Sequence, residues 1–280
     1  MFKGIIFSLL IFSNMIKANV TDNEPLHLTF GLYANEKPSL IVKKFRGVLN
    51  QLEIILAKNL NRLVKIKINI APSYQEAVNN LVSNKVDFSR FGAGSFINAQ
   101  IKNPNIKVLA VEAKKGRRFF YGIIATHKDS QIMLMSDLKG KSFAFGDLYS
   151  TIGRYLAQNE LIKNKVTPDT LSHFKYFERH DSVGVALVHK KFDAGALKNS
   201  TYQKLLENGM QLKSILQIKT PTKPWIASSK LDPDTANAIE QVLLTLSPLN
   251  IDNNSGFSFL SYDKSVFKHL KNIILNKRHF

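Results

Sequence analysis

Hydrophobic and polar positions along the chain alternate between the spacing of strands and that of helices. Residues 64–71 alternate strictly, with Lys65 and Lys67 between apolar residues, and residues 26–33 also read as a strand. Residues 38–60, between these two runs, have apolar positions at helical spacing. Further strands are predicted at 86–91, 106–113, 119–127, 141–147, 173–177 and 192–197, and further helices at 151–161, 181–189 and 265–275. This alternation predicts an α/β fold with mainly parallel strands.

Three more helices are predicted from their first residues. Ser73 is followed three residues later by Glu76, which is the spacing of a capping box. Asp232 precedes Pro233, and proline favours the first turn of a helix. A short helix is predicted to begin near Ser95.

Two stretches interrupt the alternation. Residues 114–118 are basic and turn-prone, and Pro221 and Pro224 mark a second junction. Two α/β series joined by two crossings predict two lobes, the first from residues 26–115 and 221–280 and the second from residues 116–220. In such folds a ligand binds at the carboxyl ends of the strands, here in the cleft between the lobes.

The first 18 residues have the features of a cleavable signal peptide. Lys3 precedes an apolar run over residues 5–12, and the small residue Ala18 follows. The run is shorter than the roughly 20 residues that span a bilayer. A buried N-terminal helix is the alternative interpretation. Export to a bacterial periplasm is the simplest expectation for the rest of the chain.

The composition is strongly basic. The chain has 39 Lys and Arg against 21 Asp and Glu, a formal net charge of +18, which favours nucleic acid, an anionic membrane surface or an anionic ligand as partner. Export argues against a nucleic-acid partner. The absence of cysteine excludes a disulfide framework, a thiolate metal site and a lipid-modified N-terminal cysteine.

The most informative stretch is residues 137–153. A strand is predicted to end at Gly146 and Asp147, and after a turn Ser150 and Thr151 stand at the start of a helix. Two hydroxyls, free backbone N–H groups and the positive end of the helix dipole would suit a tetrahedral oxyanion. An ordinary helix N-cap is the alternative interpretation.

Several motifs together resemble the phosphate, phosphite and phosphonate-binding family of periplasmic solute-binding proteins, which serve ABC importers. They are listed here with their residues: SDLKGKSFAFGD (136–147), STIG (150–153), HD (180–181), FDAGA (192–196), APSY (71–74) and VDFSRFG (86–92). The resemblance implies a two-lobed type 2 periplasmic-binding-protein fold with the two crossings as a hinge. It also implies a small oxyanion ligand, a permease in the inner membrane as partner, and a monomer without cofactor, metal or enzymatic activity.

By the same resemblance, Ser150 and Thr151 of the Ser-Thr-x-Gly element, which ends at Gly153, would hold the oxygens of the ligand. His180 would donate to the same oxygens, and Tyr74 matches an aromatic residue that contacts the ligand from the first lobe. The alternatives are a residue at a helix start for His180 and first-turn packing for Tyr74. A second family aromatic is matched by Phe120, which lacks the hydroxyl and stands beside Tyr121.

Two positions set this chain apart from family members that bind aminoalkyl phosphonates. Ser200 and Lys223 stand where those proteins carry acids for the ammonium group, so an aminophosphonate is not the expected ligand. Arg90 is a candidate for a bidentate pair with an oxyanion, or for a structural pair with an acid such as Asp87. Trp225 is a candidate wall of the cleft, or a core residue.

Three other functions remain open at this point. The same fold serves periplasmic sensor subunits that present their closed form to a membrane receptor, and binding-protein folds have been adapted to catalysis. A basic exported protein that binds anionic polymers or lipids is the third alternative. His173, His180 and His189 do not form a metal motif, and no nucleophile elbow or Walker loop is present.

Overall fold

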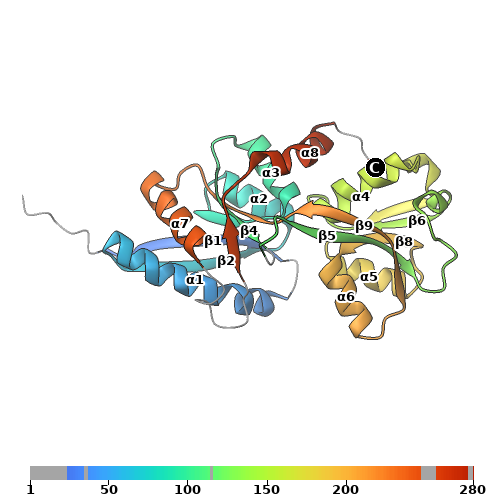
Figure 1. Cartoon of the computed structure of the whole chain (residues 1–280), viewed down its shortest axis with the longest axis horizontal. Helices are drawn as coiled ribbons and strands as arrows, with labels where there is room; N and C mark the ends of the chain where they lie inside the picture. Colours follow the sequence, from blue (N-terminus) through green and yellow to red (C-terminus); the bar gives the residue numbers. More distant parts are fainter. Residues whose placement is uncertain (1–23, 35–36, 114–115, 247–256, 277–279) are drawn as a thin grey trace, which may run out of the picture.

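A computed structural model describes residues 24–34, 37–113, 116–246, 257–276 and 280. The signal peptide predicted for residues 1–18 lies outside these residues. Two sheets divide the described chain into two lobes, which lie side by side in Figure 1. Within the described ranges, no helix is long and apolar enough to cross a membrane.

The first lobe is built on a six-stranded sheet with the order β11-β4-β10-β3-β1-β2. Its strands are β1 (Leu26–Tyr33), β2 (Val64–Ala71), β3 (Phe88–Arg90), β4 (Lys107–Ala113), β10 (Pro224–Ala227) and β11 (Ser258–Leu260). Its helices are α1 (Pro38–Leu60), α2 (Tyr74–Val82), α3 (Ala93–Lys102), α7 (Pro233–Thr245) and α8 (Lys264–Leu275). β1 is parallel to both β2 and β3, and β10 is antiparallel to β3 and β4.

The second lobe is built on a five-stranded sheet with the order β7-β6-β8-β5-β9. Its strands are β5 (Phe119–His127), β6 (Ser142–Phe145), β7 (His173–Tyr176), β8 (Ala194–Lys198) and β9 (Leu212–Pro221). Its helical segments are α4 (Ala157–Lys163), α5 (His180–Val188), α6 (Asn199–Glu207), the π-helix η2 (Thr151–Leu156) and the 3₁₀ turns η1 (Met135–Leu138) and η3 (Pro168–Thr170). β6 is parallel to β7 and β8, whereas β5 is antiparallel to β8 and β9.

The two crossings run side by side between the lobes. Phe119 at the start of β5 pairs with Pro221 at the end of β9, and the Thr222 backbone N–H donates to the Arg118 carbonyl at 2.9 Å. Figure 1 shows β5 and β9 as long neighbouring strands that lead from the middle of the molecule into the second lobe. The two connections therefore form one hydrogen-bonded ribbon.

The first lobe is centred on Trp225, which fits the second of its two sequence interpretations, a core residue, and does not form a wall of the cleft. β10 lies between β3 and β4, so the indole is fully buried, with ring centroids 4.6 Å from Phe30 and 5.1 Å from Phe259. Its Nε1–H donates to the Glu112 carboxylate at 3.1 Å, which satisfies the one polar atom of the side chain.

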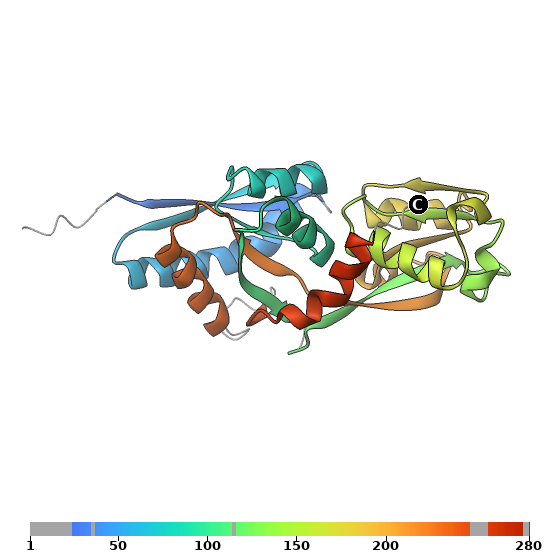
Figure 2. The ribbon, with the colours of Figure 1, turned by 90° about the horizontal axis from the view of Figure 1, so that it is seen from above.

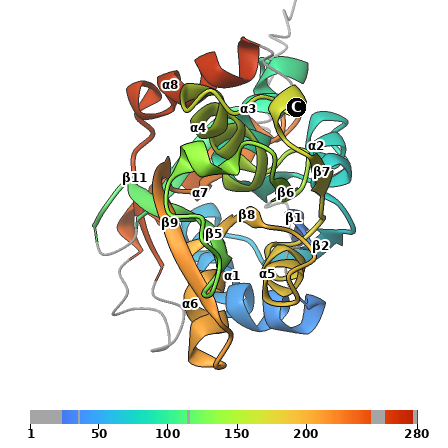
Figure 3. The same cartoon turned by 90° about the vertical axis from the view of Figure 1, so that its right-hand side faces the viewer.

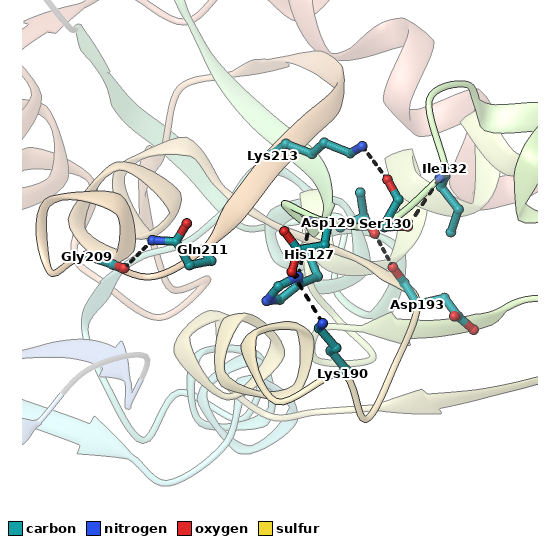
Figure 4. A network of polar contacts seen from close by, with 10 residues as sticks. His127, Asp129, Ser130, Ile132, Lys190, Asp193, Gly209, Gln211 and Lys213 are labelled. Atoms are coloured by element: carbon teal, nitrogen blue, oxygen red, sulfur yellow. Dashed lines mark hydrogen bonds and ion pairs between the residues drawn. The ribbon is translucent and has the colours of Figure 1, made fainter.

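A polar network ties together the far end of the second lobe (Figure 4). Asp129 lies 3.4 Å from His127 Nδ1 and 3.4 Å from Lys190 Nζ, and Lys213 Nζ donates to the Ser130 carbonyl. These contacts join the end of β5 to β9 and to the turn after α5. They therefore stabilise the end of the sheet that lies farther from the crossings.

The last helix packs on both lobes. Phe267 in α8 makes an edge contact with Phe96 of α3, with ring centroids 5.6 Å apart, and α8 also contacts η2 of the second lobe. The ring centroids of Phe280 and Phe145 in β6 are 5.3 Å apart, and the main-chain oxygen of Phe280 accepts from the Tyr176 hydroxyl at 3.2 Å. Figure 2 shows α8 reaching from the first lobe toward the second.

The sequence predictions are confirmed in part at the level of elements. The α/β architecture, the strand at Val64–Ala71 and the helix at Pro38–Leu60 are as expected, and Ser73 accepts the Glu76 N–H as its cap. The helix predicted at 151–161 begins instead as a π-helix. Elements that sequence patterning did not predict are α6, β9, β10 and β11.

Replacing the central indole tests this packing. Trp225→Ala should lower the free energy of unfolding by about 3–5 kcal/mol, because it removes a large buried side chain and leaves a cavity. Urea unfolding followed by far-ultraviolet circular dichroism measures the loss. Tyr121→Ala, at an exposed position on β5, is the control and should change stability by less than about 0.5 kcal/mol. Equal effects of the two substitutions would contradict the assignment of Trp225 to the core.

Candidate functional site

A small cavity lies between the two lobes, with about 30 Å³ of free volume. The residues that line it come from both sheets and from one crossing: Tyr33, Tyr74, Gly92, Phe120, Ser150, Thr151, Ile152, His180, Lys198 and Lys223. In Figure 3, viewed along the long axis, β5 and β8 lie near the middle of the view, with α3 and α2 above them. The closed form leaves room there only for a small ligand.

Five helices begin at this cavity. Tyr74 and His180 are the first residues of α2 and α5, and Gly92, Ser150 and Lys198 are the N-cap residues of α3, η2 and α6. Each helix N-terminus carries a partial positive charge and N–H groups without an intrahelical partner. Their convergence gives the cavity a positive potential that favours an anion.

Three hydroxyl groups at the cavity accept hydrogen bonds from glycine N–H groups. Tyr33 accepts from Gly92 at 2.9 Å, Ser150 from Gly153 at 3.0 Å, and Thr151 from Gly94 at 2.8 Å. A hydroxyl has one proton to donate and accepts with its lone pairs. Because these oxygens already accept an N–H, each hydroxyl proton is left for donation to a ligand.

The hydrogen bond between Gly94 and Thr151 also joins the lobes. Gly94 lies in the first turn of α3, whose N-cap residue is a glycine without a side chain, so Thr151 caps that helix from the opposite lobe. Ser95 Oγ adds a second link by donating to the Tyr149 carbonyl at 3.2 Å. The cleft is therefore closed in this structure.

Glycine is required where the lobes approach. A Cβ atom on Gly94 would lie 2.9 Å from Tyr155 Cδ2 and 3.2 Å from the Thr151 backbone, and a Cβ on Gly92 would lie 3.1 Å from Thr151 Oγ1. The backbone contacts cannot be relieved by a rotamer change. Any larger residue at position 94 therefore opposes closure.

The start of η2 adds backbone donors. Tyr155 N donates to the Ser150 carbonyl five residues earlier, as in a π-helix. Among the described residues no acceptor is found for the N–H groups of Thr151 and Ile152, both of which line the cavity. These two N–H groups, together with the Ser150 and Thr151 hydroxyls, match the arrangement that the sequence predicted for an oxyanion.

His180 is a neutral imidazole at this site. It is 8% exposed, and burial together with the nearby charges of Lys198 and Lys223 lowers its pKa to about 3. Its Nδ1 atom is buried and has no hydrogen-bond partner among the described residues. A buried polar atom without a partner at a cavity wall is available to a ligand.

The two tyrosines of the first lobe form a stacked pair. The ring centroids of Tyr33 and Tyr74 are 3.7 Å apart, and both side chains are buried. Burial raises the pKa of both phenols, and the Asp147 carboxylate adds to each shift. Both hydroxyls therefore remain protonated and able to donate at neutral pH.

Asp147 lies just before η2 and is an acid in an unfavourable position for ionisation. Burial raises its pKa to about 6, with a further increase from the charge of Glu178, while the Tyr149 N–H opposes the shift by donating to Oδ1 at 2.6 Å. Asp147 does not line the cavity. The donors that do line it are hydroxyl, imidazole, amide and ammonium groups.

Six of the ten residues singled out in the sequence come together here: Tyr74, Phe120, Ser150, Thr151, His180 and Lys223. Arg90 does not line the cavity, because it is 6% exposed and forms a bidentate ion pair with Glu112, at 2.7 and 2.9 Å. Tyr121 is 43% exposed on the other face of β5 from Phe120. Trp225 is in the core, and Gly153 contributes only the N–H that Ser150 accepts.

Sequence reasoning missed four lining residues, Tyr33, Gly92, Ile152 and Lys198. Tyr33 and Lys198 end their strands, and Gly92 follows β3 by two residues. Because ligands bind beyond the carboxyl ends of parallel strands, the ends of these strands carried a usable signal. In the part of the chain that the structure describes, no group of His, Asp and Glu side chains has the arrangement of a metal site.

The depressed pKa of His180 predicts acid sensitivity. The unfolded chain binds a proton at His180 below about pH 6.5, whereas the folded protein does so only near pH 3. Stability should therefore fall as the pH drops through this interval, by up to about 1.4 kcal/mol per pH unit from this group. His180→Gln should flatten the decline, measured as the melting temperature between pH 7.5 and 4.5.

The control is the exposed His189, which follows α5. His189→Gln should keep the pH slope of the wild-type protein. If His180→Gln also kept that slope, the buried neutral imidazole would be refuted.

Comparison with known proteins places this geometry in a family. The profile of the ABC transporter, phosphonate, periplasmic substrate-binding protein family matches residues 30–265. The probable ABC transporter phosphite binding protein PhnD1 of Prochlorococcus marinus is 25% identical over 249 residues, 82% of this chain and 77% of that protein. The phosphonates-binding periplasmic protein of Escherichia coli is 26% identical over 249 residues, 83% of this chain and 70% of that protein.

Solved structures show the same two-lobed fold. The structure of PhnD1 from Prochlorococcus marinus in complex with methylphosphonate has a TM-score of 0.77 at 21% identity and covers 90% of this chain and 98% of its own. A binding protein component of an ABC phosphonate transporter from Pseudomonas aeruginosa also has a TM-score of 0.77, at 18% identity, covering 91% of this chain and 87% of its own. The chain thus belongs to the family of periplasmic substrate-binding proteins of phosphonate ABC transporters.

Proposed function

We propose that this protein binds a small phosphorus oxyanion between its lobes and delivers it to an ABC permease in the inner membrane. The observation that carries the proposal is the convergence of five helix N-termini and three proton-donating hydroxyls on one cavity. Relatives described as binding phosphite and methylphosphonate support the choice of ligand class.

The groups at the cavity have defined roles in this proposal. Ser150 and Thr151 donate their hydroxyl protons to the oxygens of the ligand, and the N–H groups of Thr151 and Ile152 donate to the same oxygens. Tyr33 and Tyr74 donate from the first lobe, so the ligand would draw the lobes together. His180 Nδ1 donates as a neutral imidazole or, in the other tautomer, accepts from an oxyanion that carries a proton.

Lobe movement would use the paired crossings. We place the lobe boundaries at residues 115–116 and 220–221, where the hydrogen bond between Thr222 and Arg118 joins the two connections. Rotation about this ribbon would break the bond between Gly94 and Thr151 and expose the cavity. Closure excludes water, which strengthens every hydrogen bond to the anion.

The remaining parts of the proposal concern location and mode of action. The protein would be exported by a signal peptide over residues 1–18, act as a monomer and carry out no chemical reaction on its ligand. Transport, as opposed to sensing, is favoured by relatives that are components of ABC transporters.

Removal of one hydroxyl tests the binding site. Thr151→Val keeps the shape of the side chain but removes both the donor to the ligand and the acceptor for Gly94. Binding of phosphite or methylphosphonate should weaken about tenfold or more, because a hydrogen bond to a charged group contributes about 1.5–3 kcal/mol. The shift of the melting temperature at a fixed ligand concentration measures the effect.

Thr245→Val is the matched control, because this exposed threonine at the end of α7 bonds only to its own helix. It should give the full ligand-induced shift. Absence of a shift in the wild-type protein with phosphite, phosphate and methylphosphonate would overturn the proposed function.

A second variant tests closure. Gly94→Ala should prevent the lobes from meeting, since the added methyl group would press on the Thr151 backbone. Ligand should then cause no decrease in the radius of gyration measured by small-angle X-ray scattering, and affinity should fall. Gly47→Ala in α1, where a Cβ meets nothing within 4 Å, is the control and should close as the wild type does. Full compaction of Gly94→Ala would contradict the closed contact described above.

A further inference from the structure

Lys223 places a cation without a direct partner at the wall of the cavity. The residue lies in the second crossing, its ammonium group is 5.7 Å from the centroid of the Phe120 ring, and Lys198 lines the same cavity. Among the described residues, charges act on Lys223 Nζ from a distance and none forms a hydrogen bond or ion pair with it. The contact found for the ammonium group is with the aromatic ring of Phe120.

The charged groups that act on Lys223 among the described residues come from four elements. Arg90 on β3, Lys198 on β8 and Lys44 on α1 repel its charge, and Glu112 on β4 attracts it. His180 at the start of α5 shares the wall, and so do the phenols Tyr33 on β1 and Tyr74 on α2. Among the described residues, cations therefore outnumber acids around this ammonium group.

The one acid of this set is already engaged. Glu112 accepts two hydrogen bonds from Arg90 and a third from the Trp225 indole. Its charge is neutralised by the buried guanidinium, so it provides little compensation for a second cation. Among the residues that the structure describes, no acid lines the cavity, and five helix N-termini add to the positive potential.

We propose that Lys223 makes this cleft select small phosphorus oxyanions in their doubly charged form and reject those whose substituent carries a positive charge. The inference rests on the oxyanion-binding function proposed above. A dianion supplies the negative charge that the wall lacks and favours the protonated form of Lys223. An ammonium substituent on the ligand would then meet the protonated Lys223, the charge of Lys198 and the helix N-termini. The geometry excludes the second class of ligand by repulsion.

Proton uptake on binding follows from the same arrangement. Burial, with the charges of Arg90 and Lys198, lowers the pKa of Lys223 well below its usual range in the free protein. A bound dianion reverses this electrostatic balance, so Lys223 Nζ takes up a proton from solvent as the ligand enters. The affinity for a dianion should then decline as the pH rises and that proton becomes harder to acquire.

Titration calorimetry with phosphite tests the coupling. At a pH well above the second ionisation of phosphite, the ligand is already a dianion and contributes no proton of its own. Titrations in two buffers of different ionisation enthalpy then give the number of protons taken up by the protein. The wild-type protein should take up protons, and Lys223→Met should take up fewer and bind about tenfold or more weakly.

Lys219→Met is the matched control. Lys219 is an exposed lysine on β9, four residues before Lys223, and its ammonium group also lies over an aromatic ring, 4.2 Å from the centroid of Phe119. This variant should match the wild type in affinity and proton uptake. Circular dichroism of each variant reports whether it is folded.

A matched pair of ligands tests selectivity on the wild-type protein, so the result does not depend on the folding of a variant. Ethylphosphonate and aminomethylphosphonate have the same number of heavy atoms and differ in a methyl group against an ammonium group. Ethylphosphonate should bind about tenfold or more tightly than aminomethylphosphonate.

The outcomes separate the two proposals. If the wild type binds phosphite without proton uptake and Lys223→Met binds it equally well, the role of Lys223 is overturned and the proposed function stands. Equal binding of the two phosphonates has the same consequence. If the wild type binds none of these oxyanions, the proposed function is overturned, and the role of Lys223 with it.

Discussion

Five helices begin at the wall of one cavity, and the rest of the site depends on the electrostatic consequence. Partial positive charges from their N-termini meet at a place where burial has removed much of the screening by water. A carboxylate at the wall would neutralise this potential, and none is found among the described residues that line the cavity. The neutral His180 and the protonated tyrosines fit the same constraint, because they form hydrogen bonds without adding a further positive charge to the cavity.

Hydrogen bonds from glycine N–H groups orient the hydroxyl groups of the cavity, so the site has a preferred geometry for an anion as well as a favourable potential. The N–H groups of Gly92, Gly94 and Gly153 each donate to one hydroxyl oxygen. Each bond orients that hydroxyl group and leaves its proton free to be donated to a ligand. The bond from Gly94 also crosses between the lobes, so the same contact that orients Thr151 completes the cap of α3. Closure and donor orientation are therefore coupled through a single side chain.

Much of this arrangement could be predicted from the sequence. The rest could not, because the spacing of apolar residues does not specify hydrogen-bond type or tertiary contacts. Regular elements such as Pro38–Leu60 and Val64–Ala71 follow from local patterning, and Ser150 and Thr151 follow from a hydroxyl pair at a helix start. The π-helix does not, because apolar spacing over so short a segment does not distinguish hydrogen bonds five residues apart from those four residues apart. Short strands such as β10 are not predicted either, because four residues that are all buried show no alternation of apolar and polar positions.

Tertiary contacts, and not local sequence, determine which basic residues form ion pairs and which line the cavity. The sequence predicted both Arg90 and Lys223 as cations close to the cleft. In the structure Glu112, on β4 across β10 from Arg90, forms an ion pair with Arg90 and not with Lys223. Trp225 sits between strands that are distant in the chain, and its partner Phe30 is almost two hundred residues away. Local sequence does not report which cation finds an acid.

The helix α8, with its contacts on α3 and η2, has a consequence for affinity at a distance from the cavity. In a protein that interconverts between open and closed forms, the apparent affinity equals the intrinsic affinity multiplied by the fraction of molecules in the binding-competent form. Apolar contacts that exist only when the lobes meet increase the closed population before any ligand arrives. Substitutions on the surface of α8 would therefore change the apparent affinity for the ligand without altering a contact to it. The affinity could evolve in this way while the residues of the cleft stay the same.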